Sequence, residues 1–175
     1  MDHSRKQSTT HTKKNKNHGL WTIDHGLKNT TMTIQQTLQT IASQQTSIAS
    51  FFYGTDYEAN LQADAAAFPM LHVQAITNSG AELSATSGAA RKTWPLFLFF
   101  CQQSDLDVTT AQQDAITEQM KDLAIEYVAR LNATRQYDAV SKVQFKHLFY
   151  KFDSAVCGVL AMITLRDRSG YGVCG

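Results

Sequence analysis

The stretch Trp94–Gln102, WPLFLFFCQ, is the strongest strand signal in the chain. Its apolar side chains occupy both alternating positions, whereas a strand with one exposed face alternates apolar and polar residues. A strand of this kind is buried on both sides. We therefore expect it in the middle of a sheet, with the other elements arranged around it.

Three further strands are predicted around this segment. Phe68–Ile76 precedes it, and Pro69 near its start is typical of a strand beginning or a sheet edge. In the C-terminal part, the alternating residues from Val143 lead to a turn near Asp153, and the apolar segment Ala155–Leu165 returns from that turn. These two segments predict a hairpin. Gly158, inside the return strand, indicates a bulge or a close backbone approach.

Two amphipathic helices are predicted. The first begins after the cap Thr33 and ends at Gly54, with apolar residues spaced by 4, 3, 7 and 4 positions: Ile34, Leu38, Ile41, Ile48 and Phe52. The second covers Thr110–Asn132, with Thr109 or Thr110 as cap and Gln112 or Gln113 at the capping-box distance. The polar face of the first helix is mostly Gln, Thr and Ser, which cost less to desolvate than charged residues.

The remaining segments are predicted to be connections. Tyr53–Ala67 is expected to be irregular and acidic, and the small residues of Ser79–Ala90 favour a mobile loop. The order is then helix, strand, strand, helix, strand, strand. It predicts an α+β fold with an antiparallel four-stranded sheet and two main helices packed on one face.

The chain has 175 residues, of which 43% are hydrophobic and 18% charged, as expected for one compact domain. We predict a disordered basic extension at 1–31, a single α+β domain at 32–168 and a flexible tail at 169–175. The residues before Met32 include six basic and two acidic side chains, a net charge of +4. The remainder has ten basic and thirteen acidic side chains, or −3. Met32 directly precedes the first regular pattern, so the residues before it could be an upstream in-frame extension of the working protein.

Several classes of protein are excluded by pattern. The chain has no apolar run approaching the roughly 20 residues of a membrane-spanning helix, and its N-terminus lacks the apolar core of a secretory signal. Its three cysteines, Cys101, Cys157 and Cys174, are odd in number and widely spaced. These features predict a soluble intracellular protein with neither a disulfide framework nor a zinc site.

We find no pattern of catalytic residues. The motifs of nucleophilic hydrolases, phosphate-binding loops, dinucleotide sites and zinc proteases are missing. His72 and His147 each fall in a strand, and a shared metal or acid/base role would require them to be adjacent on one face. Cys101 and Cys157 lie in apolar strands and are expected to act as small hydrophobes. The sequence predicts a protein that is not an enzyme and binds no metal or cofactor. An alternative hypothesis is an enzyme that uses His72 or His147 in a pocket.

A resemblance to a known family rests on three stretches: LFLFF at Leu96–Phe100, the helix ending near Leu131-Asn132, and FYKFDSAVCGV at Phe149–Val159. Together with the order of elements, they resemble the tail-terminator and tail-completion proteins of tailed bacteriophages, over Met32 to about Arg168. The resemblance implies a small α+β subunit that forms a ring at the head-proximal end of the tail. That ring ends growth of the tail tube and joins the tail to the head connector, and the family offers no catalytic residues.

The same resemblance implies the partners and the location. The partners are other copies of the chain in a homo-oligomeric ring, with a hexamer as one stoichiometry, the tail tube and the head-tail connector. The location is the tail or neck of the virion, assembled in the host bacterial cytoplasm. Candidate contacts lie on the uncharged helix face, in the loop of small residues and at the hairpin turn: Gln35, Gln39, Gln45, Asn78, Gly80, Glu82, Gly88, Arg91 and Asp153.

A second hypothesis from another class uses the basic extension. Lys13, Lys14 and Lys16 could neutralise phosphates without reading a base sequence. The chain would then be a small α+β protein associated with nucleic acid, whereas a solvated terminal extension is the simpler interpretation.

Overall fold

The computed structural model describes residues 32–63, 66–83, 89–105, 107–149 and 155–168. The chain divides into two units, Met1–Thr31 and Met32–Gly175, and all of these residues belong to the second. Within them the elements in chain order are α1 Ile34–Gln44, β1 Ser50–Gly54, α2 Asp56–Ala63, β2 Met70–Gln74, β3 Gly80–Leu83, β4 Ala90–Gln103, α3 Thr110–Ala133, β5 Gln144–Phe149 and β6 Val156–Arg166. The fold is α+β, as predicted.

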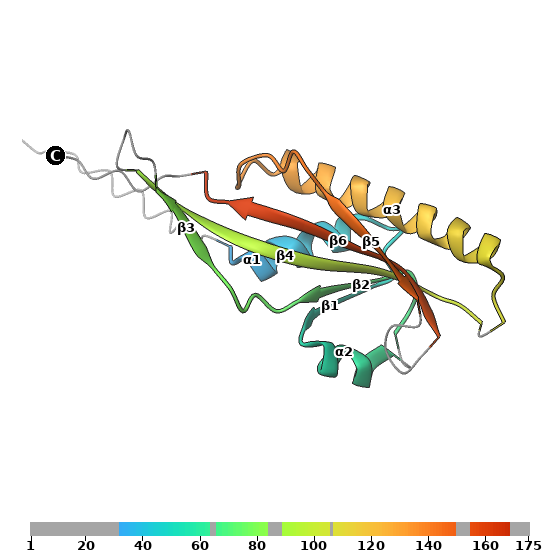
Figure 1. Cartoon of the computed structure of the whole chain (residues 1–175). Coiled ribbons are helices and arrows are strands. Elements are labelled where there is room, and N and C mark those ends of the chain that lie inside the picture. The colour runs from blue at the N-terminus through green and yellow to red at the C-terminus, as the bar shows by residue number, and fades with distance from the viewer. Residues whose placement is uncertain (1–31, 64–65, 84–88, 106, 150–154, 169–175) are drawn as a thin grey trace, which may run out of the picture. The chain divides into compact units, whose positions relative to one another are not determined.

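The six strands form one sheet (Figure 1). Five of them follow the order β1-β2-β4-β6-β5, and the sixth, β3, pairs with the first residues of β4. β4 contains the Trp94–Gln102 segment and lies between β2 and β6, so its central position is confirmed. The four predicted strands are neighbours in this sheet, and their pairings are antiparallel. The predicted four-stranded sheet lacked β1 and β3, and β1 pairs with β2 in parallel.

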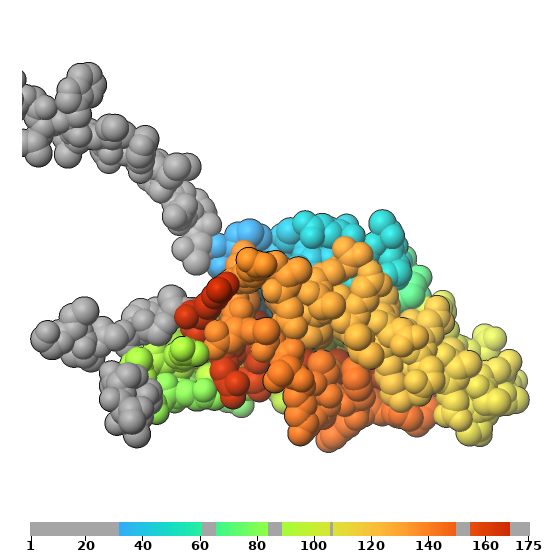
Figure 2. Space-filling model, turned by 90° about the horizontal axis from the view of Figure 1, so that it is seen from above, coloured from blue at the N-terminus to red at the C-terminus, as the bar shows by residue number. Residues whose placement is uncertain are grey.

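α1 and α3 lie side by side on one face of the sheet, which we call the helix face (Figure 2). Tyr127 of α3 is fully buried there, and its ring meets Phe100 of β4 edge-on with centroids 5.7 Å apart. Its hydroxyl donates to the backbone oxygen of Leu38 in α1 at 2.8 Å. One side chain thus links both helices to the sheet, and the predicted packing of two main helices on one face is confirmed.

The opposite side of the sheet, the open face, is covered only in part. Phe99 and Cys101 are buried there in a small cluster with Met70 and Val156. Phe97, two residues earlier in β4, is 37% exposed. Burial on both sides, predicted for the whole Trp94–Gln102 segment, is therefore correct only for its second half.

The predicted first helix is too long. Thr33 caps it with Gln36 in a reciprocal capping box, but α1 ends at Gln44, and Ile48 and Phe52 lie outside it. Ser50–Gly54 instead pairs with β2, which directs Phe51 and Phe52 to opposite faces of the sheet. Ile48 and Phe52 fit the helical spacing only by coincidence. Pairing with the distant strand β2 overrides this local pattern.

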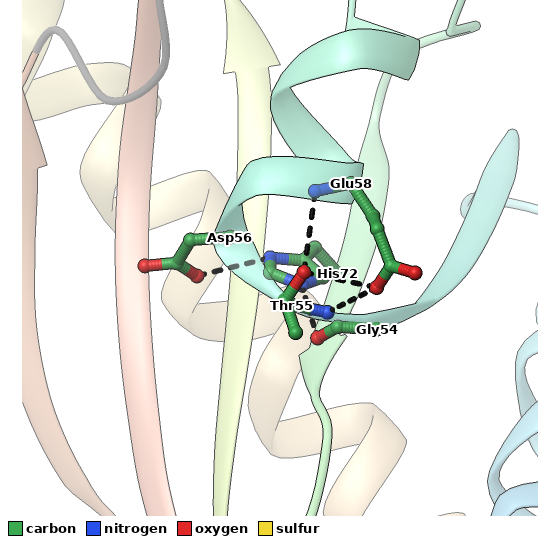
Figure 3. Close-up of polar contacts among 5 residues, drawn as sticks. All are labelled: Gly54, Thr55, Asp56, Glu58 and His72. Carbon is green, nitrogen blue, oxygen red and sulfur yellow. Dashed lines mark hydrogen bonds and ion pairs between the residues drawn. The ribbon is translucent and has the colours of Figure 1, made fainter.

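Two segments predicted to be connections contain regular structure. Tyr53–Ala67 includes α2, which Thr55 and Glu58 begin by exchanging backbone-to-side-chain hydrogen bonds (Figure 3). The Glu58 carboxylate accepts hydrogen bonds from both the backbone nitrogen and the hydroxyl of Thr55, and these two bonds lower the pKa of Glu58. Thr-x-x-Glu is itself a capping-box signal, so α2 could have been predicted. Ser79–Ala90 includes β3, which only its pairing with β4 reveals.

The C-terminal hairpin is confirmed by the pairing of β5 with β6, in which Phe145 faces Ala161. Gly158 is paired with Cys101 in an unbroken register, so it marks a close backbone approach rather than a bulge. A Cβ atom at Gly158 would overlap the Phe100 carbonyl oxygen. The predicted turn at Asp153 lies outside the described residues.

Candidate functional site

His72 of β2 is a fully buried polar side chain, and its surroundings are the first candidate for a functional site (Figure 3). Its ring lies between two phenyl rings, with centroid distances of 5.6 Å to Phe52 and 5.2 Å to Phe99. Its Nε2 is 3.2 Å from the Gly54 carbonyl oxygen, and its Nδ1 is 3.9 Å from Oδ1 of Asp56 in α2. Because a carbonyl oxygen only accepts, Nε2 carries the proton in that contact. The contact with Gly54 joins β2 to the end of β1, immediately before α2 begins.

The two histidines are far apart in the sheet. His72 is in register with Phe99, which pairs with Leu160 and through it with Lys146, so these four side chains share the open face. His147 follows Lys146 in β5 and points to the other face. Two strands and the thickness of the sheet separate the rings, so the structure does not bring them together for a shared metal or proton-transfer role.

The two described cysteines lie on neighbouring strands, β4 and β6, but on opposite faces of the sheet. Cys101 is buried in the open-face cluster, whereas Cys157 is buried beside Ser104, with the sulfur 3.2 Å from the hydroxyl oxygen. Neither forms a disulfide within the described part of the chain, and their burial fits the predicted role as small hydrophobes. Cys174 lies outside the described residues.

Neither a metal-binding cluster nor a helix suited to span a membrane is present among the described residues. No group of three or more His, Cys, Asp or Glu side chains there is arranged to hold a metal ion. Among the helices of the same residues, none has the length and apolar character that crossing a membrane requires.

The candidate contacts on α1 divide into two kinds. Gln35 and Gln39 are exposed on the helix surface, as a contact requires. Gln45 is only 1% exposed, because its Nε2 donates to the Leu123 backbone oxygen of α3 at 3.2 Å. Its assignment as a surface contact is therefore corrected: Gln45 follows the end of α1, where the chain turns inward.

The candidate contacts Asn78, Gly80, Glu82 and Arg91 gather on one projection. We call this the β3–β4 arm and define it as Gly80–Leu83 with its paired residues Ala90–Thr93. Asn78 leads into it, and its residues are mostly exposed, with Leu83 at 76%. Leu83 was not predicted as a contact, although a lone large apolar residue in a segment of small and polar residues is a usable signal.

Two exposed ion pairs connect the outer half of this arm, at Glu82 and Arg91, to the rest of the domain. Nη1 of Arg91 lies 2.8 Å from Oδ2 of Asp138, and Nε of Arg166 lies 3.0 Å from Oε1 of Glu82. Pairs as exposed as these contribute little to stability, about 0 to 1 kcal/mol each. They orient the arm but do not cover it.

The described surface is hollowed in two places. A groove of about 410 Å³ lies on the open face between β4, β6 and the segment 138–142, with Phe97 and Met162 in its floor. A second hollow of about 700 Å³ lies where β4 ends and α3 begins. We call it the acidic hollow, and its lining is Gln103, Ser104, Asp105, Asp107, Val108, Gln112, Ala115 and Ile116.

The other predicted site residues lie outside the described residues. They are the contacts Gly88 and Asp153 and the nucleic-acid candidates Lys13, Lys14 and Lys16.

No protein-family model matches the chain, and no curated protein matches it either.

Proposed function

We propose that this chain is a structural subunit of a tailed-phage virion, resembling the tail terminators. Copies of it would form a ring at the head-proximal end of the tail, end the growth of the tube and join the tail to the head connector. The observation that carries the proposal is the β3–β4 arm.

The arm supports the proposal because its outer part, where Glu82 and Leu83 pair with Arg91 and Ala90, is a two-stranded ribbon, whereas at its base Thr93 also pairs with Arg166 of β6. Only β4 pairs with β3 in the described part of the chain, and all four β3 residues are exposed. An isolated pair of strands is marginally stable in water, and an open strand edge invites pairing or covering. Leu83, among the most exposed large apolar side chains described, adds to that cost. A neighbouring subunit would supply the missing surface.

The remaining surface suits a ring subunit. A ring requires a contact between two different surfaces of identical copies. Gln35 and Gln39 present uncharged polar groups on α1, opposite the buried residues that pack on α3. Such a face can be covered at less desolvation cost than a charged one. α1 and the arm are thus two separate places where a subunit or another tail protein could bind.

Two measurements test the proposal. Light scattering after size-exclusion chromatography should give a closed oligomer with a defined number of copies, and electron microscopy should show rings. In a phage that carries the gene, loss of the chain should give overlong tubes and heads without joined tails. A strict monomer at all concentrations, with tails of normal length in the mutant phage, would contradict the proposal.

The charge distribution favours a second candidate, a nucleic-acid-associated protein. The residues before Met32 have a net charge of +4, and a basic segment binds phosphates through release of counterions. DNA affinity should then fall steeply with salt and disappear when residues 1–31 are removed. Binding that survives this removal would reject the candidate.

A further inference from the structure

The two ends of β4 carry opposite charge. Around the β3–β4 arm at its beginning there are six basic and three acidic side chains, a formal net charge of +3: Arg91, Lys92, Arg135, Lys142, Arg166 and Arg168 against Glu82, Asp138 and Asp167. Figures 1 and 2 place the β3–β4 arm and the first turns of α3 at opposite ends of the described domain.

The acidic hollow lies at the other end of β4. Asp105 and Asp107 are exposed at its rim, and Asp114 follows in the first turns of α3. No ion pair within the described part of the chain involves any of these three carboxylates. Val108 and Ile116 are half-buried in the lining, so the hollow combines an apolar floor with an acidic rim.

The arm matches this hollow in chemistry. It presents the exposed apolar side chain of Leu83 beside Arg91 and Lys92. Within one molecule the two cannot meet, because the 14 residues of β4 separate them by roughly 45 Å at about 3.3 Å per residue. The arm of one copy can reach the hollow of another copy only.

We propose that the β3–β4 arm of one copy docks into the acidic hollow of the next copy. Leu83 would pack on Val108 and Ile116, and Lys92 would lie against Asp105 and Asp107. The arm and the hollow are different surfaces at opposite ends of one strand, so the contact is head-to-tail, and its repetition closes a ring when the rotation per copy permits. This inference rests on the proposed ring function and specifies the subunit contact within it.

A charge exchange tests the contact. The arm variant is Lys92→Glu, and the hollow variant combines Asp105→Lys with Asp107→Lys. Each variant alone places like charges against each other, so the concentration for half-assembly should rise on the order of tenfold or more. In an equimolar mixture every arm finds a hollow of opposite charge. Assembly should return, with an even number of copies alternating between the variants.

Two controls change charge elsewhere, at exposed positions: Lys146→Glu on β5 matches the arm variant, and Asp122→Lys on α3 makes one of the two Asp-to-Lys changes of the hollow variant. They should assemble like the wild type. Circular dichroism and thermal unfolding check that every variant is folded.

The outcomes separate the two proposals. If the wild type forms rings but the folded variants assemble equally well, or their mixture does not recover, the arm–hollow contact is wrong while the ring function stands. If the wild type stays monomeric at all concentrations and the mutant phage has normal tails, the ring function fails and the contact falls with it.

Discussion

Gly158 shows at the residue scale how closely β4 and β6 approach. A Cβ atom there would overlap backbone atoms of Phe100 and Cys101, which cannot move without breaking the centre of the sheet. We expect Gly158→Ala to lower the free energy of unfolding by about 3 kcal/mol or more, at the upper end for overpacking. Urea unfolding measures this. Gly80→Ala is the control, because its Cβ would meet only the Thr93 hydroxyl, and an equal loss in both variants would contradict the argument.

Tyr127 allows a prediction about pH. In an unfolded chain a tyrosine loses its proton near pH 10, whereas burial raises the pKa of Tyr127 well above its ordinary value in the folded state. The folded state therefore binds more protons above about pH 10, and its free energy of unfolding falls as the pH rises. Tyr127→Phe should flatten this alkaline decline.

The same substitution has a second effect at neutral pH. Removing the hydroxyl deletes the hydrogen bond to the Leu38 backbone oxygen, at a cost of about 1 kcal/mol. Denaturant unfolding from pH 7 to pH 11 measures both effects. Tyr57→Phe, at a side chain 73% exposed, should change neither. A Tyr127→Phe profile parallel to the wild type would refute the assigned pKa direction.

At the element scale, α3 begins at one of two adjacent threonines that the sequence offered as caps. Thr109 is the cap: its Oγ1 accepts from the Gln112 backbone nitrogen at 3.4 Å, and its own backbone nitrogen donates to Oε1 of Gln112 at 2.9 Å. Thr109→Ala should cost about 1 kcal/mol. Thr110→Ala, at the first helical position, should be neutral or slightly stabilising because alanine is the better helix former. Thermal unfolding of the two variants distinguishes the positions, and equal losses would be unexpected.

At the scale of the whole molecule, the exposed apolar residue of the arm should matter for assembly and not for folding. Leu83 makes little buried contact within its own chain, so Leu83→Glu should change the free energy of unfolding by no more than about 0.5 kcal/mol. Under the ring proposal the same change should weaken or abolish the oligomer. Light scattering at several concentrations compares it with Ile125→Glu on α3, where the side chain is 52% exposed and lies away from the arm. Loss of assembly in both variants would argue against a specific role for the arm.

The sequence by itself determined where the two main helices begin, four of the six strands and the position of β4 among them. Each of these rests on a local signal: the apolar segment at Trp94–Gln102, helical spacing in α1 and α3, a capping box, or alternation next to a turn. Such signals survive in the fold because they reflect short-range physics that packing reinforces.

The tertiary structure alone decided the features that depend on distant residues. β1 forms because Ser50–Gly54 pairs in parallel with β2. Gln45 can be buried because the Leu123 backbone oxygen of α3 accepts a hydrogen bond from its side chain. The separation of His72 from His147, and the placement of the arm and the acidic hollow at opposite ends of β4, follow from strand order and face. No local pattern encodes them, since pairing between distant segments is selected by the free energy of the whole packed sheet.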